Sequence, residues 1–251
     1  MGKAAGPVTG YIHSVESFAL VDGPGVRSCV FLQGCRMRCR YCHNPDTWSL
    51  DGGRPETAEA VLKRLIRFRP YWRDNGGITV SGGEALLQMA FVTELFTLAR
   101  AQGIHTALDT CGQPFCEDPG YLEDFDRLMA VTDLVILDIK EMDGEAHRAL
   151  TGHPNGNILA MARYLSDHGK AMWIRHVLVP GLTDGEAGLK ALREFLGTLK
   201  TVERTEILPY HTLGIYKWEN LGIPYTLKDA VPPTEEEIAR ARELLGISSE
   251  S

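Results

Sequence analysis

The stretch Cys35-Arg-Met-Arg-Cys39-Arg-Tyr-Cys42 places three cysteines within eight residues, at the spacing C-x3-C-x2-C. This spacing lets three thiolates face one centre, as a cuboidal iron–sulfur cluster requires, and leaves one iron of a four-iron cluster open to another ligand. Zinc is the competing interpretation, because it also favours thiolates. Structural zinc needs four ligands, usually from two cysteine pairs, and a second pair is missing. His43 could supply a nitrogen, but the metal would then cap one short loop, so the spacing favours an open cluster.

Composition points to a soluble intracellular protein. The chain has 251 residues, 44% of them hydrophobic, and a formal net charge of −7, which argues against a nucleic-acid partner. No apolar run reaches membrane-spanning length, and the start MGKAAGPVTG has no secretory signal. Six cysteines without an export signal indicate the reducing cytoplasm and metal binding rather than disulfides. We expect one domain over residues 1–251 with loose ends at 1–9 and 247–251, and no membrane partner.

Short β-rich runs alternate with helical patterns along the chain, which predicts parallel strands with right-handed crossovers. One helical pattern carries Val61, Leu62 and Leu65. Capping-box spacing predicts helix starts at Thr183 and Thr234. The six predicted strands are Ser28–Leu32, Ile78–Val80, His105–Leu108, Leu134–Ile139, Met172–Val179 and Glu206–Leu208.

A polar or glycine-rich signature follows each predicted strand, and this favours a barrel over a doubly wound sheet. In a barrel all the carboxyl ends of the strands converge on one mouth, where active sites lie. An open doubly wound sheet would concentrate the site at one switch point. The signatures are the cysteine loop, Ser81-Gly82-Gly83-Glu84, Asp109-Thr110, Asp138-Ile139-Lys140, Pro180-Gly181 and Pro209-Tyr210-His211. We therefore predict a partial (β/α)6 barrel of the TIM type.

Taken alone, most of these residues have structural explanations. Glu84 could bind an ammonium group, but a solvated glutamate after a tight Gly-Gly turn is the simpler interpretation. Asp138 and Lys140 fit a buried ion pair as well as a ligand site. His211 fits a structural histidine, and Asp22-Gly-Pro-Gly25 predicts only a turn.

The remaining cysteines and the arginines of the cysteine loop also have two interpretations. Cys29 lies mid-strand and is expected to be a small buried residue. Two further cysteines, Cys111 and Cys116, are expected to be thiols rather than a disulfide. Three arginines interleave the cluster cysteines and form either a solvated loop or a docking patch for an acidic electron carrier. They are Arg36, Arg38 and Arg40.

Taken together, the motifs resemble those of radical S-adenosylmethionine enzymes that activate glycyl-radical enzymes, and most closely the pyruvate formate-lyase-activating group. The resemblance runs from about Gly10 to the final helix. It rests on Val21-Asp-Gly-Pro-Gly-Val-Arg27, Gln33-Gly-Cys through Cys42-His-Asn44, Ser81-Gly-Gly-Glu-Ala85, Gly103-Ile-His-Thr, Val131-Thr-Asp-Leu-Val, Leu137-Asp-Ile-Lys140, Trp173-Ile-Arg175, Val179-Pro-Gly181 and Leu208-Pro-Tyr-His211.

This resemblance implies a [4Fe-4S] cluster on Cys35, Cys39 and Cys42, with the open iron bound to S-adenosylmethionine. It also places Asp109, Thr110 and Asp138 near a monovalent cation. Asp22 and Arg175 would face the glycine loop of the partner protein. The implied cofactor-binding residues are Tyr41, Cys42, His43, Gly82, Gly83, Glu84, Asp109, Thr110, Asp138, Ile139, Lys140 and His211.

The implied reaction is reductive cleavage of S-adenosylmethionine to methionine and a 5′-deoxyadenosyl radical, which takes a hydrogen atom from a glycine of pyruvate formate-lyase in anaerobic glucose metabolism. Flavodoxin or a similar protein would donate the electron, and the activase would be a monomer. Cysteines are absent between Cys42 and Cys111, which disfavours relatives with a ferredoxin-like insert. The alternatives are an activase of anaerobic ribonucleotide reductase and, from another class, a non-catalytic zinc or iron–sulfur carrier.

Overall fold

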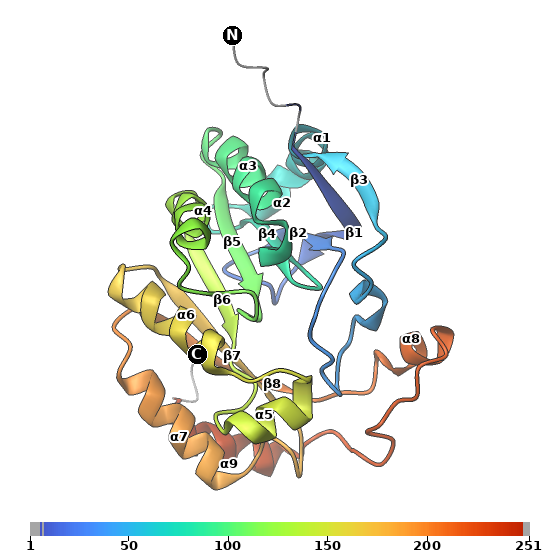
Figure 1. Cartoon of the computed structure of the whole chain (residues 1–251), viewed down its shortest axis with the longest axis vertical. Coiled ribbons are helices and arrows are strands. Elements are labelled where there is room, and N and C mark those ends of the chain that lie inside the picture. The colour runs from blue at the N-terminus through green and yellow to red at the C-terminus, as the bar shows by residue number, and fades with distance from the viewer. Residues whose placement is uncertain (1–5, 7, 248–251) are drawn as a thin grey trace. The chain divides into compact units, whose positions relative to one another are not determined.

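The computed structural model describes residues 6 and 8–247, and these form eight strands and nine α-helices (Figure 1). The predicted loose ends, 1–9 and 247–251, fall largely outside the described residues, and the first strand begins at Thr9. The strands are β1 (Thr9–Ala19), β2 (Arg27–Leu32), β3 (Arg54–Thr57), β4 (Gly77–Gly82), β5 (His105–Thr110), β6 (Leu134–Asp138), β7 (Met172–Leu178) and β8 (Val202–Pro209).

Helices follow most of the strands, as the sequence pattern predicts. They are α1 (Ala58–Leu65), α2 (Arg69–Trp72), α3 (Met89–Arg100), α4 (Pro119–Ala130), α5 (Gly144–Thr151), α6 (Gly156–Asp167), α7 (Glu186–Gly197), α8 (Ile215–Asn220) and α9 (Glu235–Leu245). Three short 3-10 helices are η1 (Pro45–Thr47), η2 (Ile66–Phe68) and η3 (Ala85–Gln88). None of the described helices is both long enough and apolar enough to span a membrane.

The chain divides into two compact units, each assembled from three separate stretches. Among the described residues, the first holds 6, 8–35, 49–110 and 117–135, and the second holds 36–48, 111–116 and 136–247. In the first unit the strand order is β3-β1-β2-β4-β5-β6, and in the second it is β6-β7-β8, with β6 divided between the two. The assignment of residues 1–251 to a single domain stays a prediction.

The sheet is mostly parallel and open, which confirms the predicted α/β class. Strands β2, β4 and β5 are parallel to one another, as are β7 and β8. Strands β1 and β3 were not predicted, and both pair antiparallel at the start of the chain. Strand β1 carries polar residues on a partly exposed surface, and β3 contains Pro55, which suits an edge strand.

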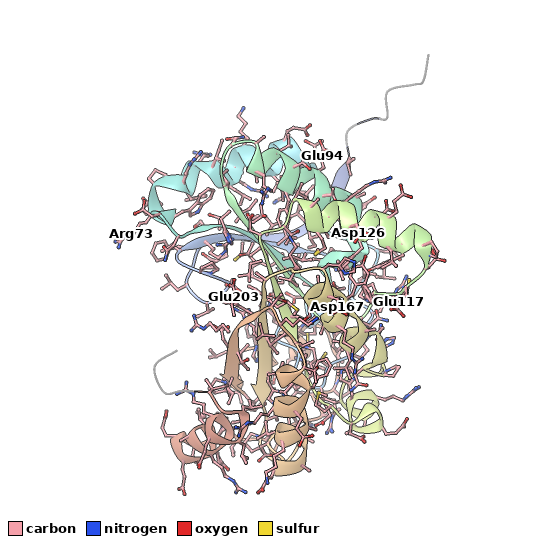
Figure 2. The ribbon with its side chains drawn as sticks, turned by 90° about the vertical axis from the view of Figure 1, so that its left-hand side faces the viewer. Arg73, Glu94, Glu117, Asp126, Asp167 and Glu203 are labelled. Atoms are coloured by element: carbon pink, nitrogen blue, oxygen red, sulfur yellow. The ribbon has the colours of Figure 1, made fainter. Side chains whose placement is uncertain are left out.

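In the first unit, helices α1, α3 and α4 lie side by side against the strands (Figure 1). Their apolar faces meet a core in which Val80, Phe91 and Leu95 are at most 1% exposed. Charged side chains such as Glu117 and Asp126, labelled in Figure 2, are exposed and point outward. This separation of apolar and charged faces is what the helical spacing predicts.

In the second unit, an aromatic core lies beside the cysteine loop. It packs Tyr41, Tyr210, Trp218 and Tyr225, and the Tyr210 and Tyr225 hydroxyls lie 2.7 Å apart. Because a hydroxyl both donates and accepts, the pair satisfies itself without water.

One of the two predicted helix starts is confirmed. Thr234 and Glu237 form a full capping box at α9. The prediction for Thr183 is wrong, because α7 begins after Gly185 without a side-chain cap. Thr183 instead donates to the Val177 carbonyl at 2.6 Å and accepts from the Val179 amide at 2.8 Å. Its hydroxyl therefore stabilises the turn after β7 rather than the next helix.

Candidate active site

The turn after β4 requires glycine at two successive positions. At Gly82, where φ is +122°, a Cβ would lie 2.1 Å from the Leu32 nitrogen. At Gly83 a Cβ would lie 2.3 Å from the Gly34 oxygen and 3.1 Å from the Cys35 Cβ. Because real Cβ contacts are never so short, the backbone after β4 approaches the start of the cysteine loop only with glycine there.

Glu84, next in the chain, is buried rather than solvated, so the simpler interpretation of this residue is wrong. It is 2% exposed, and its carboxylate accepts from the Leu86 amide at 2.9 Å and the Thr110 hydroxyl at 2.5 Å. One carboxylate thus caps η3 and joins the end of β4 to the end of β5. The predicted ligand role of Glu84 stays a prediction.

The ends of β4 and β5 are also joined by Asp109, which accepts from the Ser81 hydroxyl at 2.5 Å. Asp109 and Thr110 belong to the first unit and Asp138 to the second. The predicted cation site, which needs all three, therefore stays a prediction.

In the second unit the cysteine loop is held through its backbone. The amides of Arg38 and Arg40 donate to the carbonyls of Thr151 and Leu150, at 2.7 and 3.0 Å, at the end of α5. The Trp218 indole donates to the Cys42 carbonyl at 2.9 Å. These bonds involve only the main chain of the loop and not its thiol groups.

Tyr41 and Lys140 are the buried residues beside the cysteine loop in the second unit. Tyr41 is 4% exposed, and the Lys140 ammonium lies 5.7 Å from its ring centroid, over the face. The same ammonium pairs with Asp138 at 2.7 Å. Burial raises the pKa of Tyr41. For Lys140 burial opposes the charge, but Asp138, Tyr41 and Cys39 raise its pKa well above the usual value. Both groups are therefore protonated at neutral pH.

The Tyr41 hydroxyl is buried and has no hydrogen-bond partner among the described residues. An orphaned buried hydroxyl costs stability unless something pairs with it. Three nearby features share this unit: the thiols of Cys39 and Cys42, the hydroxyl, and the Asp138–Lys140 pair. This set of soft ligands and polar groups fits a thiolate-bound metal cluster with a polar ligand beside it.

The fold brings His43 and His211 into contact, and the sequence around either residue does not predict this contact. Their rings stack with centroids 4.0 Å apart and planes 17° apart. His43 Nε2 donates to the His211 carbonyl at 3.2 Å. Burial, and then the neighbouring His211, lower the pKa of His43. The His43 ring is therefore neutral at neutral pH, which suits contact with a flat, uncharged ring.

Arg175 is also buried, at 5% exposure, and its Nε donates to Glu206 at 2.9 Å. Glu206 is shared with Arg204 on the same strand at 3.1 Å. The resemblance predicts that Arg175 faces the glycine loop of the partner protein, but the sequence pattern does not predict Glu206 as its ion-pair partner. The two lie on adjacent strands in register, so strand pairing rather than local pattern brings them together.

The three cysteines predicted to hold the cluster are divided between the two units. Cys35 is 8% exposed in the first unit, while Cys39 is 9% exposed and Cys42 half-buried in the second. No disulfide forms among the six cysteines, all of which lie in the described part of the chain. Cys29 is fully buried, as predicted, and its pKa is raised, first by burial and then by Asp22.

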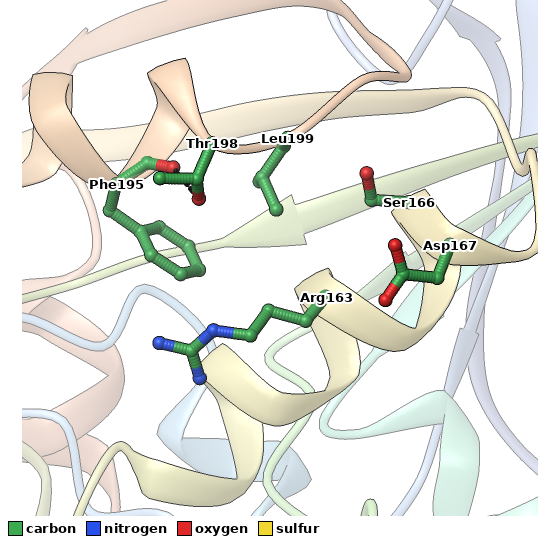
Figure 3. A pocket seen from close by; sticks show the side chains of 6 residues that line it. All are labelled: Arg163, Ser166, Asp167, Phe195, Thr198 and Leu199. Atoms are coloured by element: carbon green, nitrogen blue, oxygen red, sulfur yellow. Dashed lines mark hydrogen bonds between the residues drawn. The ribbon is translucent and has the colours of Figure 1, made fainter.

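A separate cavity of about 300 Å³ lies between α6 and the end of α7 (Figure 3). Arg163 stacks on the Phe195 ring at 5.1 Å, and Asp167 lies at the same opening. None of its lining residues belongs to the predicted site.

Comparison with known proteins adds a decisive observation. Residues 29–191 match the Radical SAM superfamily. The chain belongs to the radical SAM superfamily. Two curated relatives are named pyruvate formate-lyase-activating enzyme. The one from Streptococcus mutans is 58% identical over 95% of this chain and 91% of its own length. The one from Listeria monocytogenes is 48% identical over 96% and 98%.

Solved structures agree with this assignment. A domain of pyruvate-formate lyase-activating enzyme from Bacteroides vulgatus is 28% identical, with a TM-score of 0.56, over 68% of this chain and 93% of that one. A radical SAM methyltransferase from Sphaerobacter thermophilus, at 18% identity and a TM-score of 0.65, shares the fold over 88% of this chain and 63% of that one.

Membership of the radical SAM superfamily implies a [4Fe-4S] cluster and S-adenosylmethionine as cofactors, and it makes the protein an enzyme. The carrier interpretation, with zinc or iron–sulfur, is therefore set aside. Which residues hold the cofactors stays a prediction. The buried cysteine thiols, the Gly82-Gly83 approach and the orphaned Tyr41 hydroxyl fit the predicted ligands.

Proposed function

We propose that this radical SAM enzyme activates pyruvate formate-lyase by forming a glycyl radical in it. The observation that carries the proposal is the 58% identity, over 95% of the chain, to a protein named for that activity. When bound, S-adenosylmethionine would supply the carbon radical that takes a hydrogen atom from the glycine, and the cluster would supply the electron that generates this radical. The chain itself binds and orients the reactants and keeps water away.

The test is anaerobic incubation of the protein with reductant, S-adenosylmethionine and pyruvate formate-lyase, watched by electron paramagnetic resonance. We expect a glycyl radical on the lyase and, in step with it, lyase activity. Anaerobic ribonucleotide reductase is the matched control. A radical on the reductase alone would move the proposal to that partner class.

In this proposal the cysteine loop and its surroundings divide the work of binding. Cys35, Cys39 and Cys42 hold the cluster. The Gly82-Gly83 turn admits the methionine end of S-adenosylmethionine, because no Cβ obstructs its backbone. Lys140 supplies a cation for a carboxylate, and its pair with Asp138 keeps that cation charged although it is buried. The neutral His43 lines the adenosyl side, and His211, which stacks on it, binds the adenine end.

Asp22 and Arg175 are proposed to bind the glycine loop of the lyase. The segment before Asp22 carries Leu20 and Val21 at 64% and 72% exposure, and exposed apolar residues are typical of protein-binding surfaces. The partner's glycine must leave its own folded surroundings, and a charge-assisted hydrogen bond offsets about 1.5–3 kcal/mol of that cost.

Asp22→Asn and Arg175→Ala should therefore lower glycyl-radical yield more than tenfold at limiting lyase, since about 1.4 kcal/mol corresponds to a factor of ten. Arg204→Ala is the matched control, because Arg204 shares Glu206 with Arg175 but is far more exposed. Parallel loss of S-adenosylmethionine affinity in the two test variants would reassign them to cofactor placement.

The electron donor is proposed to be an acidic protein such as flavodoxin, docking on the arginines of the cysteine loop. Arg36 and Arg38 are exposed, and Arg38 stacks on Trp48 at 4.9 Å. Arg40 is half-buried and donates to Thr226, so it contributes less to such a patch. Replacing both Arg36 and Arg38 with glutamine should slow reduction of the cluster by flavodoxin. Added salt should slow the same reduction in the unsubstituted protein. Equal slowing with a small chemical reductant would indicate cluster damage instead.

The protein is further proposed to act as a monomer in the cytoplasm. The six cysteines, none of them in a disulfide within the described residues, suit a reducing compartment. Sedimentation of the anaerobic protein tests the monomer, and a stable dimer would exclude it.

A further inference from the structure

The Arg27 side chain is fully buried at the start of β2, directly after the Asp22-Gly-Pro-Gly25 turn. It is 0% exposed and has the largest volume of the fully buried side chains in the described chain. Burial lowers its pKa to about 10, so it is still a cation at neutral pH. Burying a cation is costly unless hydrogen bonds replace its hydration.

The hydrogen-bond partners of Arg27 are neutral groups, namely three backbone carbonyls, the Thr79 hydroxyl and the His105 ring, and two of them lead to the turn. Its Nη1 donates to the Pro24 carbonyl at 3.1 Å. Its Nε donates to the Thr79 hydroxyl at 2.6 Å, and that hydroxyl donates to the Asp22 carbonyl at 2.7 Å. The third nitrogen, Nη2, donates to the Ile78 carbonyl on β4 at 2.5 Å and lies 3.3 Å from both the carbonyl oxygen and the ring Nδ1 of His105 on β5. Arg27 therefore joins the Asp22-Gly-Pro-Gly25 turn, at Pro24 directly and at Asp22 through Thr79, to the neighbouring strand β4.

The shape of the turn matches this anchor. Gly23 has φ of +126°, and a Cβ there would lie 2.8 Å from the Cδ atom of Arg27. The arginine stem thus passes directly beneath the turn. Thr79 is fully buried, so its hydroxyl has no water to replace either bond.

We propose that Arg27 and Thr79 are positioning residues that fix the Asp22 backbone so that its carboxylate meets the glycine loop of the lyase. This inference rests on the proposed function of Asp22. The Thr79 hydroxyl is the link, because it accepts from Arg27 and donates to Asp22. Neither residue needs to touch the substrate.

The test removes the Thr79 hydroxyl and keeps the shape of the side chain. Thr79→Val removes the hydroxyl, and Thr79→Ser keeps it. The probe is a synthetic peptide that spans the radical glycine of pyruvate formate-lyase, with peptide-dependent S-adenosylmethionine cleavage as the readout. Thr106→Val is the matched control. Thr106 is equally buried on the adjacent β5, and its hydroxyl donates to the Val131 carbonyl at 2.8 Å, away from the turn.

We expect Thr79→Val to raise KM for the peptide about tenfold with kcat within twofold, and Thr79→Ser to restore it. A tenfold change corresponds to about 1.4 kcal/mol, within the range for an unsatisfied buried group. In an Asp22→Asn background, Thr79→Val should add no further change in KM, because it acts through Asp22.

Three results would overturn the inference: an unchanged KM in Thr79→Val, an equal rise in Thr106→Val, or full additivity with Asp22→Asn. An unchanged KM with lowered thermal stability would show that Thr79 is purely structural. Failure of the parent enzyme to respond to peptide and to form a radical on intact lyase would instead refute the proposed function, and the inference with it.

Discussion

Replacing Lys140 with methionine removes the cation from a buried pair while keeping a long, unbranched stem over the Tyr41 ring. The ammonium lies 2.7 Å from Asp138, with side-chain exposures of 9% and 24%. Removing one member of a buried ion pair costs about 3–5 kcal/mol, because the other charge is left unpaired. A quarter of the Asp138 side chain reaches solvent, which hydrates the remaining carboxylate, so we expect the cost to be about 2–3 kcal/mol.

Urea unfolding of the cofactor-free protein at neutral pH measures this cost. At a typical dependence of about 2–3 kcal/mol per molar urea, the midpoint should fall by roughly 1 M with an unchanged slope. Lys190→Met is the control, since that lysine pairs with Glu186 on an exposed helix face, where solvent screens the pair and its contribution to stability is small.

The double variant Lys140→Met with Asp138→Leu separates charge from packing. Removing both charges should recover most of the lost stability, because neither is then left unpaired. If Lys140→Met is no more destabilising than Lys190→Met, or if the double variant is worse than both single variants together, the buried-pair explanation fails. Independently of stability, the proposed carboxylate contact predicts weaker S-adenosylmethionine binding in Lys140→Met.

Three further predictions follow from the same structure. Alanine at any one of the three proposed cluster cysteines should abolish S-adenosylmethionine cleavage. Cys111→Ala should keep both the cluster and cleavage. Loss of iron from Cys111→Ala would show that the ligand assignment is wrong. Trp218→Phe removes the hydrogen bond to the Cys42 carbonyl but keeps an aromatic ring against Tyr225. Loss of this bond, at about 1 kcal/mol, should let a chelator extract the cluster severalfold faster. An unchanged extraction rate would exclude a role for Trp218 in holding the cysteine loop. Burial, followed by Arg27, lowers the pKa of His105 in the folded protein. Below about pH 6.5 the unfolded state therefore binds more protons at this histidine than the folded state does. The stability that neutral His105 contributes is fully present above that pH and is lost on acidification. The urea midpoint should therefore fall between pH 7.5 and 5.5, and less steeply in His105→Gln; equal slopes would assign the acid sensitivity to other groups.

Most of the strands that the sequence predicts are buried on both sides, whereas β8 is largely half-buried. Strands buried on both sides are continuous apolar runs, as in Leu134–Asp138, and their pattern does not depend on the partner strand. Strand β1 mixes polar and apolar residues and is stabilised by pairing with β2 and β3, which lie at different distances along the chain. Its existence is decided by tertiary contacts, which local pattern does not contain.

The candidate site was predictable as a set of motifs but not as a set of contacts. The spacing of the cysteines and the Gly-Gly-Glu signature name residues directly. The partners that fix them are distant in sequence: Trp218 bonds Cys42 from 176 residues away, and Glu206 pairs with Arg175 across 31 residues. Glu84 was expected in solvent because a glutamate after a turn usually is, but the neighbouring β5 end supplies Thr110 to pair with it.

Arg27 shows the same limit most clearly. An arginine at the entrance to a strand is ordinarily expected at the surface, and the turn before it predicts nothing more than a change of direction. Its burial follows from the register of β2 on β4, which sets Cys29 opposite Thr79 and brings the hydroxyl within reach of the guanidinium. A sequence chosen for stability alone would place an apolar residue at this position, because a buried cation with neutral partners opposes folding. A conflict between local preference and structure is expected where function constrains the chain, and here the conflict lies directly beneath the residue proposed to meet the protein substrate.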